Sequence, residues 1–198
     1  MDEKILVIPT AAINNLPVVN GFTRDVSALP DLLKLASFID RAAAETNETF
    51  RQVIPYSILK FGDEYFYYMR TKAVSEKRLS LNYSLGVGGH INPEDADFNP
   101  ADAFAIIDRA REREISEEFD CRLKPAARPA GLIIDNTSAV SRVHLGIVYE
   151  YKLLDADVTP RETLNFESLG FAGAAELHRR LDSFENWSQI VGTQYLGG

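Results

Sequence analysis

The sequence has a single cysteine and no long apolar run. Because Cys121 has no second cysteine to pair with, no disulfide can form within the chain, and a reducing compartment suits it. No stretch approaches the roughly 20 apolar residues that a membrane-spanning helix needs. The opening residues MDEK are acidic and the apolar run after them is short, unlike a secretory signal. We therefore expect a cytoplasmic protein with no membrane partner.

Positive charge is also scarce. The chain has 21 Lys and Arg against 29 Asp and Glu, which gives a formal net charge of -8 at pH 7. Duplex nucleic acid and anionic membranes bind to basic faces, so neither is an expected partner. A small anionic substrate is still compatible with this balance, because a bound cation or a local basic cluster overrides the overall field nearby.

The hydrophobic pattern predicts an extension followed by one domain. At 198 residues the chain is long enough to bury its own core. Residues 4–9, KILVIP, predict a short strand that stops at a proline, and residues 29–46 carry leucines and a phenylalanine at helical spacing. We therefore expect residues 1–50 to form a strand–helix extension that packs on a domain of residues 51–198.

The domain shows strand patterns on both sides of a long helix. Its predicted elements are a hairpin at 52–71 with its turn at Gly62–Asp63, a strand that runs into Gly88, a helix at 99–119 capped by Asn99, strands at 130–136 and 141–153, and one or two helices at 173–196. This order differs from regular βαβ repeats. It predicts an α/β (α+β) fold with a mixed sheet flanked by helices.

Three glutamates gather near the end of the long predicted helix. At about 100° per residue, Glu114, Glu117 and Glu118 fall within one arc of about 100°. The same arc passes through Ile107 and Ala110 in the preceding turns, so the acidic stripe continues an apolar one. The glutamates should therefore lie beside the buried side of the helix. The alternative is an ordinary solvated acidic face.

Carboxylates that lie so close together repel one another and raise each other's pKa. A hard divalent cation removes this conflict. Oxygen ligands suit Mg²⁺ or Mn²⁺, and Mg²⁺ is commonly shared between carboxylates, water and substrate phosphates. The pattern therefore predicts a metal site at the three glutamates.

A glycine-rich turn lies upstream in SLGVGGHINPED, where a strand ends and a loop begins. Glycines at such a place let the backbone approach a ligand closely. Taken with the helix, the turn resembles the signature of the Nudix hydrolase family, and the resemblance covers roughly residues 51–198. The residues that match are the opening glycines Gly88 and Gly89, then Arg113, Glu114, Ile115, Glu117 and Glu118, with Cys121 in the last apolar position.

The match departs from the family pattern at two positions. Ala105 stands where the family spacing places a glutamate, and Asp120 replaces the usual glycine after the glutamate pair. The loop between the glycines and the helix is longer here, so Glu94 or Asp95 could replace the missing acid. The sequence looks closest to a divergent branch described as predicted phosphoesterases.

The resemblance implies an α/β/α sandwich and a reaction. It implies that a diphosphate bond in a nucleoside-diphosphate-linked or related small molecule is hydrolysed with Mg²⁺ or Mn²⁺. Metal binding is then assigned to Glu114, Glu117 and Glu118, with the backbone carbonyl of Gly89 as an addition. Glu117 is also a candidate general base, held by Arg113 one turn earlier on the helix.

A local basic cluster, MRTKAVSEKR, is a candidate for contacts with the substrate phosphates. It includes Arg70, Lys72 and Arg78 in a chain that is otherwise acidic, although an ordinary charged loop is the competing interpretation. His90 directly follows the glycine pair and could touch a phosphate or the metal shell. His144 is more in keeping with a satisfied, partly buried histidine.

Two functions compete. The first is a Nudix-type pyrophosphohydrolase, which the intact Arg113 and the three glutamates favour. The second is a catalytically inactive Nudix-fold module that binds a nucleotide ligand or regulates a partner, which Ala105 and Asp120 favour. Residues 1–50 could cover a sheet edge, form a homodimer contact or act as a lid over the site.

Overall fold

The structure is a computed structural model of the chain and describes residues 3–14, 16, 20–71, 82–96, 103–124, 128–161 and 166–197. Its contacts divide the chain into two compact units. The first unit comprises Met1–Tyr56, Gly88–Glu114 and Pro129–Val148, and the second comprises Ser57–Val87, Ile115–Arg128 and Tyr149–Gly198. Four elements have residues in both units: strands β4 (Phe50–Phe61) and β10 (His144–Pro160), which are neighbours in the sheet, the short strand β7 (Gly86–Gly88), and helix α4 (Ala103–Glu118).

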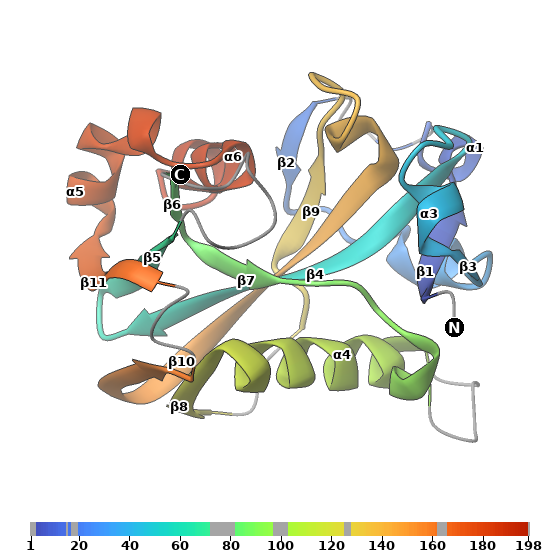
Figure 1. Cartoon of the computed structure of the whole chain (residues 1–198). Coiled ribbons are helices and arrows are strands. Elements are labelled where there is room, and N and C mark those ends of the chain that lie inside the picture. The colour runs from blue at the N-terminus through green and yellow to red at the C-terminus, as the bar shows by residue number, and fades with distance from the viewer. Residues whose placement is uncertain are drawn as a thin grey trace. The chain divides into compact units, whose positions relative to one another are not determined.

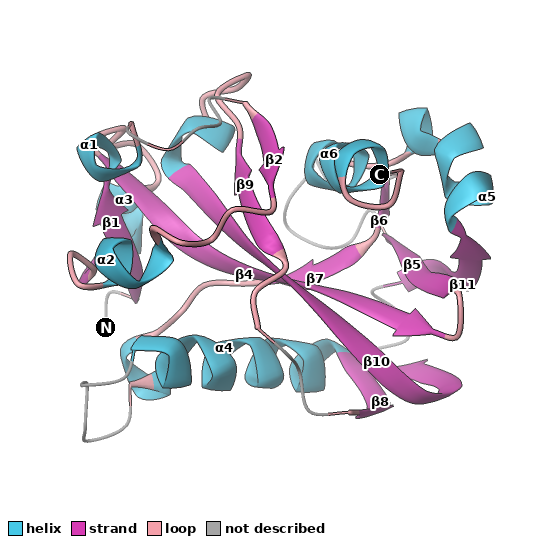
Figure 2. Cartoon of the chain, turned by 180° about the vertical axis from the view of Figure 1, so that it is seen from behind, coloured by secondary structure: helices cyan, strands magenta, loops and turns pink. Residues whose placement is uncertain are grey.

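The first unit is built around strand β1. Its other elements are α1 (Thr10–Ile13), β2 (Gly21–Thr23), α2 (Leu29–Leu33), β3 (Ser37–Asp40), α3 (Arg41–Ala44), the 3-10 turns η1 (Pro93–Asp95) and η2 (Ser141–Val143), and β9 (Gly131–Ile134). β1 (Lys4–Pro9) pairs antiparallel with β3 on one side and with the start of β4 on the other (Figure 1). β9 pairs with β2 and with the start of β10 (Figure 2).

Within the first unit, strand β1 and helix α3 contribute to a small apolar cluster. Ile5, Val7 and Ala44 are completely buried and pack together, with Ile39 and Phe50 against them. Such burial is worth about 1.5–3 kcal/mol for each large aliphatic side chain. The strand predicted at KILVIP is therefore confirmed, with its end at Pro9 as expected.

The second unit consists of a sheet with two short helices at its C-terminal end. It contains β5 (Glu64–Arg70), β6 (Tyr83–Ser84), most of β7 (Gly86–Gly88), β8 (Phe119–Leu123), β11 (Phe166–Gly173), α5 (Ala174–Arg179), η4 (Leu181–Ser183) and α6 (Asn186–Gln194). The end of β4 turns at Gly62, whose φ of 57° favours glycine, and pairs with β5. β5 also pairs with β11 and β6, and β10 pairs with β8. The predicted hairpin at 52–71 is thus confirmed.

The predicted helix at residues 29–46 is wrong. The structure ends α2 at Leu33 and places strand β3 before the short α3. Phe38 and Ile39 pair with Leu6 and Ile5 of β1, so a tertiary strand partner overrides the local helical spacing. Strands β2, β8 and β11 had no sequence prediction.

Helix α4 agrees with the prediction over its described length. Ile107 and Ala110 are fully buried, and Ile115 is almost so, which places the predicted apolar stripe inward. The predicted N-cap Asn99 lies outside the described residues. Among the described residues, no helix is long and apolar enough to cross a membrane.

Candidate functional site

The carboxyl group of Glu114 lies directly against the backbone of Gly89. A Cβ atom built at residue 89 would overlap the carboxyl carbon and both carboxylate oxygens of Glu114. At Gly88 an added Cβ would lie 3.1 Å from the carbonyl oxygen of Pro55, which is also tight. Neither glycine is among the described residues with positive φ. Glycine is therefore required at position 89, where the carboxylate occupies the space that any side chain would fill, while position 88 is tight against Pro55.

Arg113, the residue before Glu114, connects three parts of this site. Its Nε and Nη2 atoms donate to the two carboxylate oxygens of Asp95, each at 2.9 Å, in a bidentate pair. Its Nη1 donates to Glu114 Oε1 at 2.8 Å, and its Nη2 also donates to the carbonyl oxygen of His90 at 3.0 Å. The adjacent Asp95 carboxylate raises the pKa of Arg113, so the guanidinium is permanently charged. Arg113 thus fixes Glu114 and the residue after the glycines at the same time.

Asp95 is itself fixed by the turn that carries it. Its Oδ2 accepts from the backbone N–H of Asn92 at 2.8 Å, and the backbone carbonyl of Asp95 accepts from Arg109. Its side chain is only 5% exposed, whereas Glu94 is exposed. Of the two acids predicted as replacements for the missing glutamate, Asp95 is the one that the structure brings to Arg113. The pair of Arg113 with Glu117 stays a prediction.

The ring of His90 contacts a side chain of strand β4. Its Nε2 lies 2.8 Å from Oε1 of Gln52, and its centroid lies 6.3 Å from that of the His144 ring. Burial, together with the charge of Arg41 and the neighbouring His144, lowers the pKa of His90 to about 4, so the ring is neutral at pH 7. His144 Nδ1 donates to the carbonyl oxygen of Val140 at 2.7 Å, in keeping with the predicted satisfied histidine.

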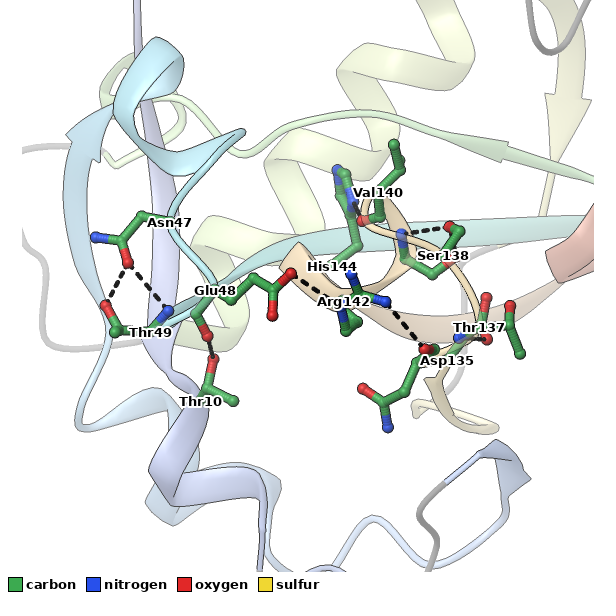
Figure 3. Close-up of polar contacts among 12 residues, drawn as sticks. Thr10, Asn47, Glu48, Thr49, Asp135, Thr137, Ser138, Val140, Arg142 and His144 are labelled. Carbon is green, nitrogen blue, oxygen red and sulfur yellow. Dashed lines mark hydrogen bonds and ion pairs between the residues drawn. The ribbon is translucent and has the colours of Figure 1, made fainter.

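A buried arginine that the sequence analysis missed organises the loop between β9 and β10. Arg51 is 4% exposed, and its guanidinium donates to the backbone carbonyls of Asp135, Ser141 and His144. Beside it, Arg142 Nε donates to Glu48 Oε1 at 2.8 Å, which ties the loop to the extension (Figure 3). The only sequence signal was a charged residue inside an apolar strand pattern.

The three candidate metal ligands differ in exposure. Glu114 is 16% exposed, Glu118 is partly buried and Glu117 is exposed. All three lie on the last two turns of α4, as predicted. In the described parts of the chain, no three His, Cys, Asp or Glu side chains are gathered closely enough to hold an ion.

The basic cluster is mostly outside the described residues. Lys72 and Arg78 lie there, and only the backbone of Arg70, at the end of β5, is described. Their predicted contacts with substrate phosphates therefore stay predictions.

Cys121 gives a prediction about reactivity. Burial, with the charges of Asp120 and Asp155, raises the pKa of the Cys121 thiol from 9.0 to about 11. Because the thiolate is the nucleophile, its reactive fraction at pH 8 should be about 100-fold below that of an ordinary thiol. We expect iodoacetamide to alkylate Cys121 slowly at pH 8, with a rate that keeps rising up to about pH 11. Mass spectrometry over time measures this; fast alkylation at pH 8 would contradict it.

Fold and site geometry together define a class. The Arg-Glu-Ile-x-Glu-Glu helix, the glycine turn and the α/β fold agree with the likeness to a solved candidate Nudix hydrolase that is 31% identical over 98% of this chain, and this chain belongs to the Nudix hydrolase family. The predicted family and fold class, α/β with a mixed sheet, are thereby confirmed.

The matches to two relatives cover almost the whole chain. The sequence is 30% identical over 205 residues to protein YmaB of Bacillus subtilis (strain 168), and the match covers 96% of each. The crystal structure of Tm1382, a candidate Nudix hydrolase, superposes with a TM-score of 0.80 and 31% identity over 98% of this chain and 99% of that one. Residues 1–50 are therefore not peculiar to this chain. No family model matches the sequence.

One more distant structure shares the fold alone. It is a bifunctional NMN adenylyltransferase/ADP ribose pyrophosphatase from Francisella tularensis, complexed with AMP and a manganese ion. Its TM-score is 0.54 at 13% identity, over 74% of this chain and 41% of that one.

Proposed function

We propose that this chain is a divalent-metal-dependent pyrophosphohydrolase that cleaves a diphosphate bond in a nucleoside-diphosphate-linked or related small molecule. The observation that carries the proposal is the position of the Glu114 carboxylate, pressed into the space left by Gly89 and held by Arg113. A solvated acidic face would have no reason to place a carboxylate against a glycine backbone. The placement fits a residue whose carboxylate oxygens bind the same metal ion as the backbone carbonyl of Gly89.

The donor set fits Mg²⁺ or Mn²⁺. Glu114, Glu117 and Glu118 would hold the ion with the carbonyl of Gly89, and all of these donors are oxygens, as these ions prefer. In the described parts of the chain these carboxylates are not gathered into a cluster, and Glu114 accepts a hydrogen bond from Arg113. The manganese in the Francisella enzyme makes Mn²⁺ the natural second assay metal.

The metal and the side chains around it would have different roles in the reaction. When bound, the cation would neutralise charge on the diphosphate and polarise the phosphorus that is attacked. Glu117, which is exposed on the last turn of α4, would take a proton from water. Arg113 is saturated by Asp95, Glu114 and the His90 carbonyl, so its role is to position Glu114. We retain Arg70, Lys72, Arg78 and His90 as candidates for contacts with the substrate.

The competing function is a catalytically inactive binding module. The sequence favoured it because Ala105 stands where the family pattern has a glutamate and Asp120 replaces the usual glycine. Asp95 supplies that acid from the turn before the helix, with both oxygens on Arg113. This supports turnover over binding alone. A cytoplasmic location and a homodimer stay predictions.

A substrate panel tests the proposal. Nucleoside diphosphate sugars, dinucleoside polyphosphates and nucleoside triphosphates would be incubated with EDTA, Mg²⁺ or Mn²⁺, and released phosphate or monophosphate measured. We expect turnover of at least one class with metal, none with EDTA, and a loss of about tenfold or more in Glu118→Gln, because one charged ligand is lost.

The matched control is Glu112→Gln, an exposed glutamate on the same helix outside the proposed site. It should turn over substrate at the wild-type rate. Metal-dependent turnover that Glu118→Gln leaves intact would remove this site assignment. No turnover on the whole panel would support the binding module instead.

A further inference from the structure

The segment that follows the glycine pair is held at three successive points. The ring of His90 is bonded to Gln52 of β4, and the carbonyl oxygen of His90 accepts from Arg113 of α4. One residue later, the carbonyl oxygen of Ile91 accepts from the backbone N–H of Leu6 in β1 at 2.8 Å. The contacts of His90 and Ile91 thus fix the position of the Gly89 peptide that precedes them. Arg113 is part of the family signature, but Gln52 is not.

Gln52 is an unusual residue for its place. Its side chain is completely buried in the strand, and it lies opposite Val7 of β1. Its Oε1 reaches His90, whereas its Nε2 has no hydrogen-bond partner within the part of the chain that the structure describes. A buried donor without a partner costs about 1–3 kcal/mol, so an apolar side chain would serve stability better at this position. The amide is therefore explained by what it does to His90.

An amide is also the partner that suits this ring. A carboxylate at position 52 would instead place a full negative charge in the buried strand. The amide oxygen accepts from the ring Nε2 and carries no net charge. It fixes the ring orientation, and with it the direction of the backbone between Gly89 and Ile91.

We propose that Gln52 is a positioning residue for the metal site: by fixing the His90 ring it holds the Gly89 peptide against Glu114. This inference rests on the proposed function, because it assigns Gln52 to the metal centre proposed there. Groups that do not bind the metal but hold its ligands in place typically contribute 10–100-fold to metal affinity or activity. Gln52 acts through the carbonyl of Gly89, so its effect should appear in metal affinity.

The test is Mn²⁺ binding, followed by the electron paramagnetic resonance of free Mn²⁺, beside activity as a function of metal concentration. In Gln52→Met we expect the Kd for Mn²⁺ to rise by about tenfold. The metal concentration for half-maximal activity should rise by the same factor, while the Tm stays near the wild-type value. His90→Phe removes the same bond and should show the same shift. The double variant should bind no more weakly than either single one, because both act through one contact.

Ser57→Ala is the matched control, because Ser57 is a buried polar residue of the same strand whose hydroxyl also lacks a described hydrogen-bond partner. Its Kd should equal that of the wild type. Wild-type Mn²⁺ affinity in Gln52→Met, or additive losses in the double variant, would overturn the inference alone. If the wild type binds no Mn²⁺, or if Glu118→Gln does not weaken its Mn²⁺ binding, the proposed metal site is overturned and this inference with it. If Gln52→Met loses the native circular dichroism spectrum, Gln52→Asn, which withdraws the amide by one methylene, gives the same readout.

Discussion

Gly89→Ala should lower kcat/KM by about 100-fold or more, the loss expected when a reacting constellation is displaced by about 1 Å. The added methyl group would occupy the position of the Glu114 carboxyl group. Glu114 is bonded to Arg113, which is in turn bonded to Asp95 and His90, so the carboxylate cannot move aside without disturbing that network. Alanine adopts the backbone conformation of Gly89 without strain, because φ there is not positive. The loss should therefore appear in activity far more than in stability.

The matched control for this variant is Gly173→Ala. An added Cβ at Gly173 meets nothing within 4 Å, and the residue lies at the start of α5 in the other unit. The two variants should have similar melting temperatures, while only Gly89→Ala loses metal-dependent turnover. Wild-type turnover by Gly89→Ala would show that Glu114 does not need the position seen here. It would then remove the main support for the proposed site.

The parts of this site that the sequence predicted are those fixed by local pattern. The helix periodicity located Glu114 beside the buried side, and the glycine pair marked a place of close backbone approach. Both follow from residues near one another in the chain. The helix predicted at 29–46 failed for the opposite reason, since Phe38 and Ile39 are strand residues only because β1 lies beside them.

The partner of Arg113 shows the limit of the sequence more sharply. Spacing left Glu94 and Asp95 equally eligible, because which of two adjacent acids faces inward depends on the turn that holds them. The structure has a capping box between Asn92 and Asp95, in which the Asp95 side chain accepts from the Asn92 backbone. The pattern Asn-Pro-Glu-Asp contains that box, so it is the signal that could have selected Asp95. No comparable signal marks Gln52, because its role depends on contact with a residue 38 positions away.

Asp95→Ala should be damaging to both stability and activity. Breaking a fully buried ion pair costs about 3–5 kcal/mol, and because the Arg113 side chain is 28% exposed, water offsets part of this, so we expect a loss of about 2 kcal/mol. Freed from Asp95, the guanidinium keeps Glu114 as its nearest carboxylate and competes with a cation for it. The apparent metal affinity should therefore fall as well, in addition to the loss of stability. Urea unfolding and Mn²⁺ titration measure the two effects separately.

Two further variants separate charge from packing. Asp108→Ala breaks the 2.7 Å ion pair with Arg111 on the same helix, whose side chain is only 3% exposed, so it should also cost stability but leave metal affinity unchanged. Asp95→Ala combined with Arg113→Met removes both charges of the site pair and should recover part of the stability, because no unpaired guanidinium remains. It should not recover activity, since Glu114 then loses the side chain that orients it. Equal metal affinity in Asp95→Ala and wild type would mean that Arg113 does not control the charge of Glu114, and its positioning role would have to be withdrawn.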